Sequence, residues 1–303
     1  MSRKAKRGAI ESDPWLFPPP PPGSQGSAEP AGRRLKYPIW TENKAKLIER
    51  YLYFFVLITK HGTYLDLFAG PQKAGSPGMW AAELVLQNRP RWLRHFHLFE
   101  KTRTGVRQLE RLKASQPPRV TKGPKKEPLR DITIHPGDSN VMVKRVLERN
   151  PIPSREATFC LLDQRTFECH WSTVEYLAAH KKGGNKIELF YFLANGWLGR
   201  AFKGQKNKEA LTAWWGRPDW SALRTMRPDE RANAFAKRLR EDLGYRSVKA
   251  YPIRQRKGGG RIMYYMIHAA DHEESPKQMY RAYHRAVTAK EPIQQLLAAF
   301  ADK

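Results

Sequence analysis

Residues 64–72, Y-L-D-L-F-A-G-P-Q, constrain the fold of this chain more than any other segment. Their apolar side chains indicate a β-strand that is buried on both faces, as in a parallel sheet. Asp66 lies near the carboxyl end of that strand, and Gly70 follows in a tight turn. Glycine can adopt the backbone angles of such a turn, and its missing side chain lets a ligand lie against the main chain. The segment therefore predicts a Rossmann-like sheet that presents this turn to a nucleotide-containing cofactor.

The rest of the chain alternates strand-like and helix-like segments, which predicts an α/β fold with a mostly parallel sheet and right-handed helical crossovers. Five strands are expected at 63–68, 95–100, 131–135, 157–163 and 187–193. Two more, at 247–253 and 262–269, are joined by a short glycine-containing loop, so they should form an antiparallel hairpin. Seven strands with a C-terminal hairpin favour a class I methyltransferase sheet over a six-stranded dinucleotide fold.

Two regions of different composition divide the chain. Residues 1–35 combine basic residues with a proline run, and this composition predicts a disordered tail because it cannot bury enough apolar surface to offset chain entropy. Residues 36–303 are long enough for one large α/β domain. Within it we expect helices at 40–53 and 274–300 and a helical insertion around 200–240.

The charge balance points to a polyanionic partner. Lys and Arg number 55 against 29 Asp and Glu, which gives a formal net charge of +26. Nucleic acid is the natural partner for such a field, although a solvated basic surface without a specific ligand is the alternative. Basic and aromatic residues interleave at 203–220, where the tryptophans either stack on bases or anchor a helical insertion. The absence of a long apolar run predicts a cytoplasmic protein with no membrane segment.

Three acidic residues recur at the ends of the first three expected strands: Asp66, Glu100 and Asp138. Ligands of open α/β sheets bind outside the carboxyl ends of the strands. Each acid alone is equally well explained as a helix cap or a solvated loop residue, so their ordered recurrence is the stronger signal.

The D-L-F-A-G motif resembles the first motif of S-adenosylmethionine-dependent methyltransferases. In such a site Asp66 would hold the methionine amino group, directly or through water. Glu100 would accept from the ribose hydroxyls and Asp138 from the adenine amine. The full set of expected cofactor contacts is Asp66, Phe68, Gly70, Glu100, Asp138 and Ser139.

The fourth and fifth strands supply the candidates for the methyl acceptor. Asp163 ends the fourth strand, where it would orient the acceptor, and Asn195 follows the fifth, where it would contribute to the substrate pocket. Enzymes that methylate amines of nucleic acids usually carry a D-P-P-Y-like tetrad at the first position. This chain instead has D-Q-R-T at 163–166, so the acceptor chemistry is not specified.

The cysteines argue against two other chemistries. Methylation of a cytosine carbon needs a cysteine nucleophile that follows a proline, whereas Cys160 follows Phe159 and Cys169 follows Glu168. The two cysteines also lack the spacing of a zinc site, even with His170 beside them, so no metal is expected.

Together these segments resemble the bacterial three-Cys-motif partner proteins, a family named after a neighbouring protein with three cysteines. The motifs that carry the resemblance are W-T-E-N-K-A-K-L-I-E-R-Y from Trp40, Y-L-D-L-F-A-G-P from Tyr64, G-S-P from Gly75, I-E-L-F from Ile187, W-G-R-P-D-W from Trp215 and Y-Y-M-I-H-A-A-D-H from Tyr264. The resemblance implies a methyltransferase-like domain and a three-Cys-motif protein as partner. Gln72 and Gln164 depart from the usual glycine and proline of the related motifs.

The sequence thus supports two hypotheses. The first is an S-adenosylmethionine-dependent methyltransferase that acts on nucleic acid or a nucleotide-bearing substrate, with Asp163 orienting the acceptor. The second is a protein with the same fold that binds nucleic acid or a partner protein without catalysis. The altered fourth-strand motif favours the second hypothesis, and the three strand-end acids favour the first.

Overall fold

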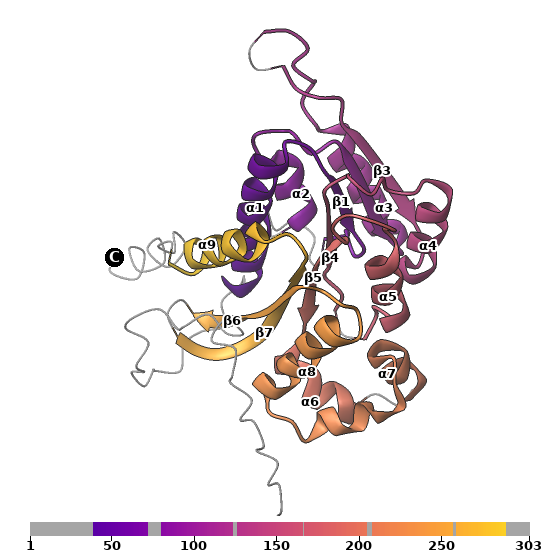
Figure 1. Cartoon of the computed structure of the whole chain (residues 1–303), viewed down its shortest axis with the longest axis vertical. Helices are drawn as coiled ribbons and strands as arrows, with labels where there is room; N and C mark the ends of the chain where they lie inside the picture. The colour runs from indigo at the N-terminus through magenta and orange to yellow at the C-terminus, as the bar shows by residue number, and fades with distance from the viewer. Residues whose placement is uncertain are drawn as a thin grey trace, which may run out of the picture.

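Seven strands form one mixed sheet in the part of the chain that the computed structural model describes, namely residues 39–71, 80–123, 126–165, 167–204, 208–256 and 259–288. The strand order is β3-β2-β1-β4-β5-β7-β6 (Figure 1). Their bounds are β1 Thr63–Asp66, β2 His95–Glu100, β3 Asp131–Pro136, β4 Thr158–Leu162, β5 Glu188–Leu193, β6 Ser247–Arg256 and β7 Gly259–Ala270.

The first five strands pair in parallel, and β7 pairs antiparallel with both β5 and β6. The prediction of an α/β fold with a mostly parallel seven-stranded sheet and a C-terminal antiparallel hairpin is therefore confirmed. The register places Asp66 beside Leu98 of β2 and Leu161 of β4. The chain reverses its direction across the sheet between β1 and β4, which is the topological switch point where ligands of open α/β sheets bind.

Helices cover both faces of the sheet (Figure 1). One apolar core joins the sheet to α1, α2, α3 and α9, and a second joins the other face to α4, α5, α6, α7 and α8. The helix bounds are α1 Ile39–Thr59, α2 Ala81–Gln87, α3 Arg103–Ala114, α4 Ser139–Arg149, α5 Trp171–Ala179, α6 Asn195–Gly204, α7 Lys208–Trp215, the 3₁₀ helix η1 Pro218–Arg224, α8 Pro228–Glu241 and α9 Glu274–Thr288.

Helix α1 crosses the sheet and reaches beyond the expected end at residue 53. Its buried side chains recur at helical spacing and include Leu47, Ile48, Tyr51 and Phe55. The apolar pattern continues to Ile58, and the helix ends at Thr59, just before Lys60 at a φ of 61°.

The segment between β5 and β6 consists of α6, α7, η1 and α8, and Trp214 and Trp215 of α7 belong to the core. Trp214 and Trp215 are 1% and 6% exposed, and both rings lie 5.0 Å from the ring of Phe235. The guanidinium of Arg238 stacks 3.7 Å from the Trp171 ring centroid and 4.4 Å from that of Trp215. The geometry favours the anchoring alternative for these tryptophans, because buried rings cannot stack on bases.

Several sequence-based expectations lie outside the described residues. They concern the basic tail at 1–35, Gln72 in the loop after β1, and the end of the expected helix beyond Thr288. Among the described helices, none combines the length and the apolar character needed to cross a membrane.

Candidate functional site

The carboxyl ends of β1, β2, β3 and β4 surround a cavity of about 370 Å³. Side chains and turns that follow four strands form its wall, although these strands are separated by up to about a hundred residues of sequence. The structure brings six of the eight predicted site residues into this lining: Phe68, Gly70, Glu100, Asp138, Ser139 and Asp163. The cavity lies at the topological switch point of the sheet, which is the place where such folds bind cofactors.

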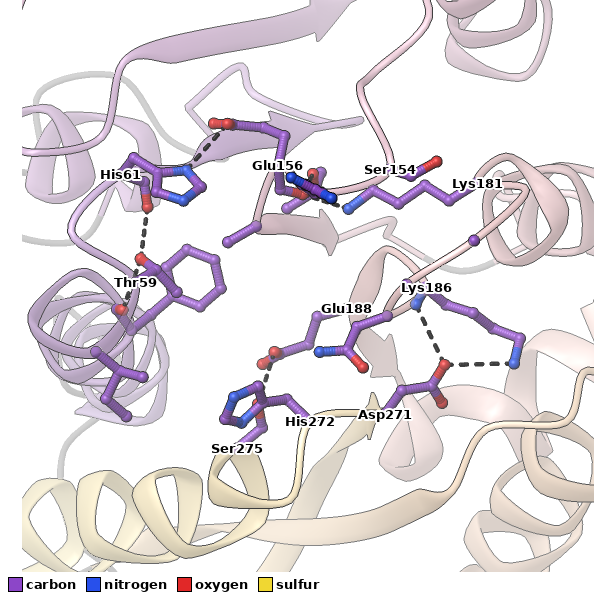
Figure 2. Close-up of a pocket in the computed structure, with 18 of the residues that line it drawn as sticks. Thr59, His61, Ser154, Glu156, Lys181, Lys186, Glu188, Asp271, His272 and Ser275 are labelled. Atoms are coloured by element: carbon purple, nitrogen blue, oxygen red, sulfur yellow. Dashed lines mark hydrogen bonds and ion pairs between the residues drawn. The ribbon is translucent and has the colours of Figure 1, made fainter.

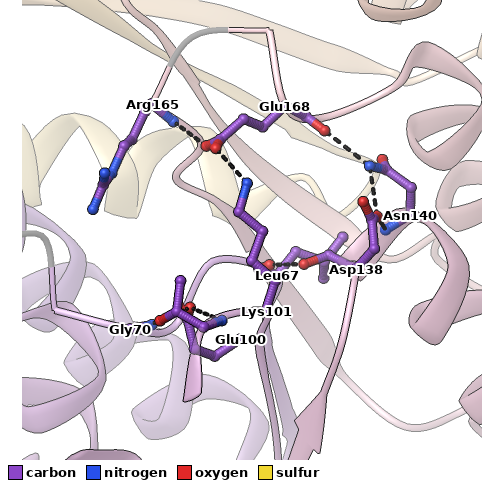
Figure 3. Close-up of polar contacts among 10 residues, drawn as sticks. Leu67, Gly70, Glu100, Lys101, Asp138, Asn140, Arg165 and Glu168 are labelled. Atoms are coloured by element: carbon purple, nitrogen blue, oxygen red, sulfur yellow. Dashed lines mark hydrogen bonds and ion pairs between the residues drawn. The ribbon is translucent and has the colours of Figure 1, made fainter. Parts of the chain in front are cut away.

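Glu100 and Gly70 form the closest contact between two of these strand ends. The Gly70 N–H donates to Glu100 Oε2 at 3.1 Å, and a Cβ at position 70 would lie 2.1 Å from that oxygen (Figure 3). Any larger residue would displace the Glu100 carboxylate from this position. Thr102 donates from its N–H and its hydroxyl to Glu100 Oε1, each at 2.7 Å. A carboxylate has about four lone-pair positions, so Glu100 can still accept hydrogen bonds from a ligand's hydroxyls.

Asp138 serves as the N-cap of α4. Its Oδ1 accepts hydrogen bonds from Asn140 N at 2.8 Å and Asn140 Nδ2 at 2.9 Å. The adjacent Ser139 hydroxyl donates to the carbonyl oxygen of Leu67, which ties the start of α4 to the turn after β1. Within the described residues, Asp138 Oδ2 has no hydrogen-bond partner. The helix-cap alternative is realised at Asp138, and one oxygen remains available to a ligand.

Asp66 lies behind the wall of the cavity. It is 1% exposed and accepts hydrogen bonds from Tyr64 Oη at 3.0 Å and Phe68 N at 3.1 Å. Burial and, to a smaller extent, the charge of Asp163 raise the pKa of Asp66 to about 7, against the opposing effects of the two hydrogen bonds and Lys44. Asp66 therefore supports the turn from behind the lining residues, and its expected contact with a cofactor, direct or through water, stays a prediction.

Asp163 lines the cavity and forms a buried ion pair with Lys44 of α1. Lys44 Nζ lies 2.8 Å from Oδ1 and 2.7 Å from Oδ2, and the two side chains are 4% and 9% exposed. The same ammonium lies 4.8 Å from the ring centroid of Phe192 and 6.0 Å from that of Tyr264. Burial raises the pKa of Asp163, and Lys44 counteracts this rise.

Sequence reasoning missed Lys44, although the sequence holds a signal. Lys44 precedes Leu47 and Ile48 by three and four residues, so it shares their buried helical face. A lysine at an apolar position of an amphipathic helix indicates a buried carboxylate partner.

Gln164 and Asn195 point away from the cavity. Gln164 is 1% exposed and donates from Nε2 to the carbonyl oxygen of Phe192 at 2.6 Å. Asn195 donates to the Pro228 carbonyl and lies 3.5 Å from Arg231 Nη1. Helix α8 thus holds Asn195 in the core, and the structure does not bring this predicted acceptor contact to Asp163.

Asn140 and Glu168 fix the loop between β4 and α5 against the cavity (Figure 3). Glu168 accepts from Lys101 Nζ at 2.7 Å and from Arg165 N at 3.1 Å. Asn140 Nδ2 donates to the Glu168 carbonyl at 2.9 Å. These two residues were not predicted as site residues, because only the folded chain brings α4 beside the β4–α5 loop.

Cys160 and Cys169 are buried and free, and burial raises the pKa of both thiols. In the described part of the chain, no group of three or more His, Cys, Asp and Glu side chains has the arrangement to hold a metal ion.

Comparisons with known proteins show similarity to solved structures but not to families or curated proteins. No protein-family model matches the sequence, and no curated protein matches it significantly. The crystal structure of protein LPL1258 from Legionella pneumophila strain Philadelphia 1, described with the family model DUF519, superposes with a TM-score of 0.42 at 9% identity. The match covers 84% of this chain and 94% of that protein.

Proposed function

We propose that this protein is an S-adenosylmethionine-dependent methyltransferase of the class I fold, acting on nucleic acid or a nucleotide-bearing substrate in the cytoplasm. One observation carries the proposal: Gly70, Glu100 and Asp138, from three successive strand ends, line a single cavity at the switch point of the sheet. The strand order supports the fold assignment, because an antiparallel β7 inserted between β5 and β6 is typical of class I methyltransferases.

The lining suits the parts of the cofactor in turn. Glu100 Oε2 accepts only one hydrogen bond within the described residues, so it has an acceptor position for a ribose hydroxyl, and Asp138 Oδ2 can accept a hydrogen bond from the adenine amine. The turn at Gly70 presents main chain without a side chain, so the cofactor's amino-acid portion can lie against it. The bound cofactor supplies an electrophilic methyl group on a sulfonium centre.

Asp163 and Lys44 would position the acceptor. A carboxylate beside the cofactor can accept a hydrogen bond from the N–H or O–H of the group to be methylated, which fixes the direction of its lone pair. Lys44 keeps this carboxylate ionised and oriented in a buried place. Catalysis would then come mainly from holding acceptor and methyl close and in line.

The formal net charge of +26 supports nucleic acid as the substrate class, since a positive field attracts a polyanion. The resemblance to three-Cys-motif partner proteins adds a second proposed partner, a three-Cys-motif protein. Salt dependence tests the nucleic-acid part: affinity for RNA or DNA should fall steeply between 50 and 200 mM salt, conditions under which a polyanion contact weakens by orders of magnitude.

Binding of S-adenosylhomocysteine, measured by isothermal titration calorimetry, tests the cofactor site. Gly70→Ala should abolish it, because the new Cβ would lie 2.1 Å from Glu100 Oε2. Gly199→Ala is the matched control, since no atom lies within 4 Å of a Cβ built there. If the folded wild-type protein binds no S-adenosylhomocysteine, or if the two variants bind it equally, the assignment fails.

A second function, binding without catalysis, is favoured by one specific observation. Lys44 contacts both oxygens of Asp163, so the carboxylate expected to orient the acceptor is already held in an ion pair. Incubation with labelled S-adenosylmethionine and mixtures of cellular RNA, DNA or protein discriminates the two functions. Cofactor binding without label transfer to any mixture would select the non-catalytic function.

A further inference from the structure

A second cavity, of about 570 Å³, lies at the amino edge of the sheet, opposite the candidate cofactor pocket (Figure 2). Its wall comes from the C-terminal half of α1, the segment before β4, the loop between α5 and β5, and the start of α9. The volume is within the range of small-molecule sites in proteins. Nothing in the proposed methyl transfer uses this cavity.

Most charged groups in this wall already have a partner. Lys186 Nζ lies 3.3 Å from Asp271 Oδ2, and Glu156 Oε2 lies 2.9 Å from His61 Nδ1. Glu188 accepts hydrogen bonds from Ser275 and two other side chains. Each carboxylate of the wall is therefore already engaged by a donor of the protein, and Asp271 is also paired with a cation.

Lys181 is the first of two charged side chains in the wall that have no acidic partner among the described residues. Its ammonium donates to the neutral carbonyl oxygen of Glu156, and no carboxylate of the described residues is within ion-pair distance (Figure 2). Burial lowers the pKa of Lys181 to about 8, and the charge of Glu156 opposes this decrease. Arg155, an exposed residue of the same wall, also has no acidic partner among the described residues. Two cations thus border the cavity without counter-ions.

The loop that carries Lys181 adds backbone donors. Residues 181–186 read K-K-G-G-N-K, and Gly184 has a φ of 71°. A Cβ at Gly184 would lie 2.8 Å from the carbonyl oxygen of Ser154, so the loop lies against the segment before β4. Within the described residues, the N–H groups of 183–185 donate no hydrogen bond. Free N–H groups around a residue of positive φ make an anion-binding concavity.

The opposite wall is apolar. Phe55 belongs to the core, and Ile58 is 43% exposed, so α1 presents hydrocarbon to the cavity. A ligand that fits this arrangement has a compact anionic head and an apolar or aromatic body. A phosphate suits the head better than a carboxylate, because ammonium, guanidinium and backbone donors approach from different sides and a phosphate offers three acceptor oxygens.

We propose that the amino-edge cavity is a binding site for a small phosphate ester with an aromatic or apolar body, whose phosphate is held by Lys181, Arg155 and the backbone of 183–185. The site is separate from the cofactor pocket and does not depend on the methyltransferase assignment.

Calorimetric titration of the full chain with phenyl phosphate tests the proposal, because this probe has the head and the body but neither adenine nor ribose. Phenyl phosphate should bind at least about ten-fold more tightly than benzoate or inorganic phosphate. Saturating S-adenosylhomocysteine should leave its affinity unchanged. Undetectable binding of phenyl phosphate, or equal affinity for benzoate, would overturn the proposal.

Variants place the probe in the cavity. Lys181→Gln should weaken phenyl phosphate at least about ten-fold, since a charge-assisted hydrogen bond contributes more than a neutral one. Lys182→Gln is the matched control, because Lys182 is exposed and outside the cavity wall, and should change affinity less than two-fold. Arg155→Gln, at an exposed position that folding tolerates, should weaken binding several-fold. Equal effects of the Lys181 and Lys182 variants would locate the probe elsewhere.

Discussion

The two edges of the sheet each hold a glutamate, and the two residues are bound in different ways. Glu100, at the carboxyl end of β2, is held by the main chain of neighbouring loops and by Thr102. Glu188, at the amino end of β5, is 6% exposed and accepts side-chain hydrogen bonds from Tyr51 of α1, His268 of β7 and Ser275 of α9. One carboxylate borders a cavity with acceptor capacity to spare, whereas the other joins four elements of the fold.

This difference distinguishes a carboxylate that is free to accept a ligand, Glu100, from one that holds the fold together, Glu188. Backbone donors keep their place when a ligand enters, so Glu100 can bind a ligand without rearrangement of the core. The donors to Glu188 have no other described acceptor for these hydrogen bonds, so its loss would leave buried polar groups unpaired. The following changes test the distinction, in order of the expected effect.

Glu188→Ala should cause the largest loss of stability. Removal of a buried charge with three donors typically lowers the free energy of unfolding by about 3–5 kcal/mol. Urea denaturation measures this loss of stability. Glu148→Ala, at an exposed position of α4, is the control, and its free energy of unfolding should lie within about 0.5 kcal/mol of wild type. A loss below about 1 kcal/mol at Glu188 would mean that the four elements are held together by apolar packing alone.

Asp66 should make stability depend on pH. Its folded-state pKa is raised from 3.8 to about 7, so the folded state retains a proton that the unfolded state releases. Stability from this group is complete below pH 4 and is lost as pH rises to about 7. Asp66→Asn should remove this loss. The difference in free energy of unfolding between the variant and the wild type should therefore shift in favour of the variant by up to about 4 kcal/mol from pH 4 to pH 8. Urea midpoints across this range measure it; parallel curves for both proteins would refute it.

Glu100→Ala should lower the free energy of unfolding by only about 1 kcal/mol, because its donors border a cavity open to ligand and solvent. The affinity of the Glu100→Ala variant for S-adenosylhomocysteine should nevertheless fall at least about ten-fold. Urea denaturation and calorimetry on one preparation give both values. A stability loss as large as that of Glu188→Ala would remove the contrast between the two edges.

Lys101→Gln should have the smallest effect. The Lys101 side chain is 56% exposed and pairs with Glu168 at 2.7 Å, and exposed ion pairs contribute about 0–1 kcal/mol. Denaturation at low and high salt should show a loss that salt reduces further. A loss above about 2 kcal/mol would show that the β4–α5 loop depends on this single pair.

Local patterns in the sequence were enough to predict the sheet and much of the lining of the carboxyl-edge cavity. Apolar runs bounded by turns mark the strands. An acidic residue at or just after the end of each of the first three strands can be recognised from a few neighbouring residues. Glu100 and Asp138 therefore meet in the cavity as their positions predicted. The sequence also shows a glutamate within the apolar run I-E-L-F. This residue is Glu188, whose buried carboxylate joins four elements of the fold.

Long-range contacts decided the residues that were misplaced. Asn195 follows a strand end just as Asp163 does, yet α8, more than thirty residues later, supplies Arg231 and the Pro228 carbonyl that hold it in the core. Trp214 and Trp215 were ambiguous for the same reason, because they are buried against Phe235 and Arg238 of α8. Spacing within a segment does not show which distant segment covers it.

Helix α1 reaches from the cavity at the carboxyl edge of the sheet to the cavity at the amino edge. It is 21 residues long, about 32 Å at helical rise, and it carries Lys44 near one end and Ile58 near the other. Lys44 contacts Asp163 in the wall of the carboxyl-edge cavity, and Ile58 lines the amino-edge cavity. A single helix thus supports the walls of both cavities. A substitution that displaces α1 should therefore alter both cavities, whereas a ligand that enters one of them leaves the helix in place.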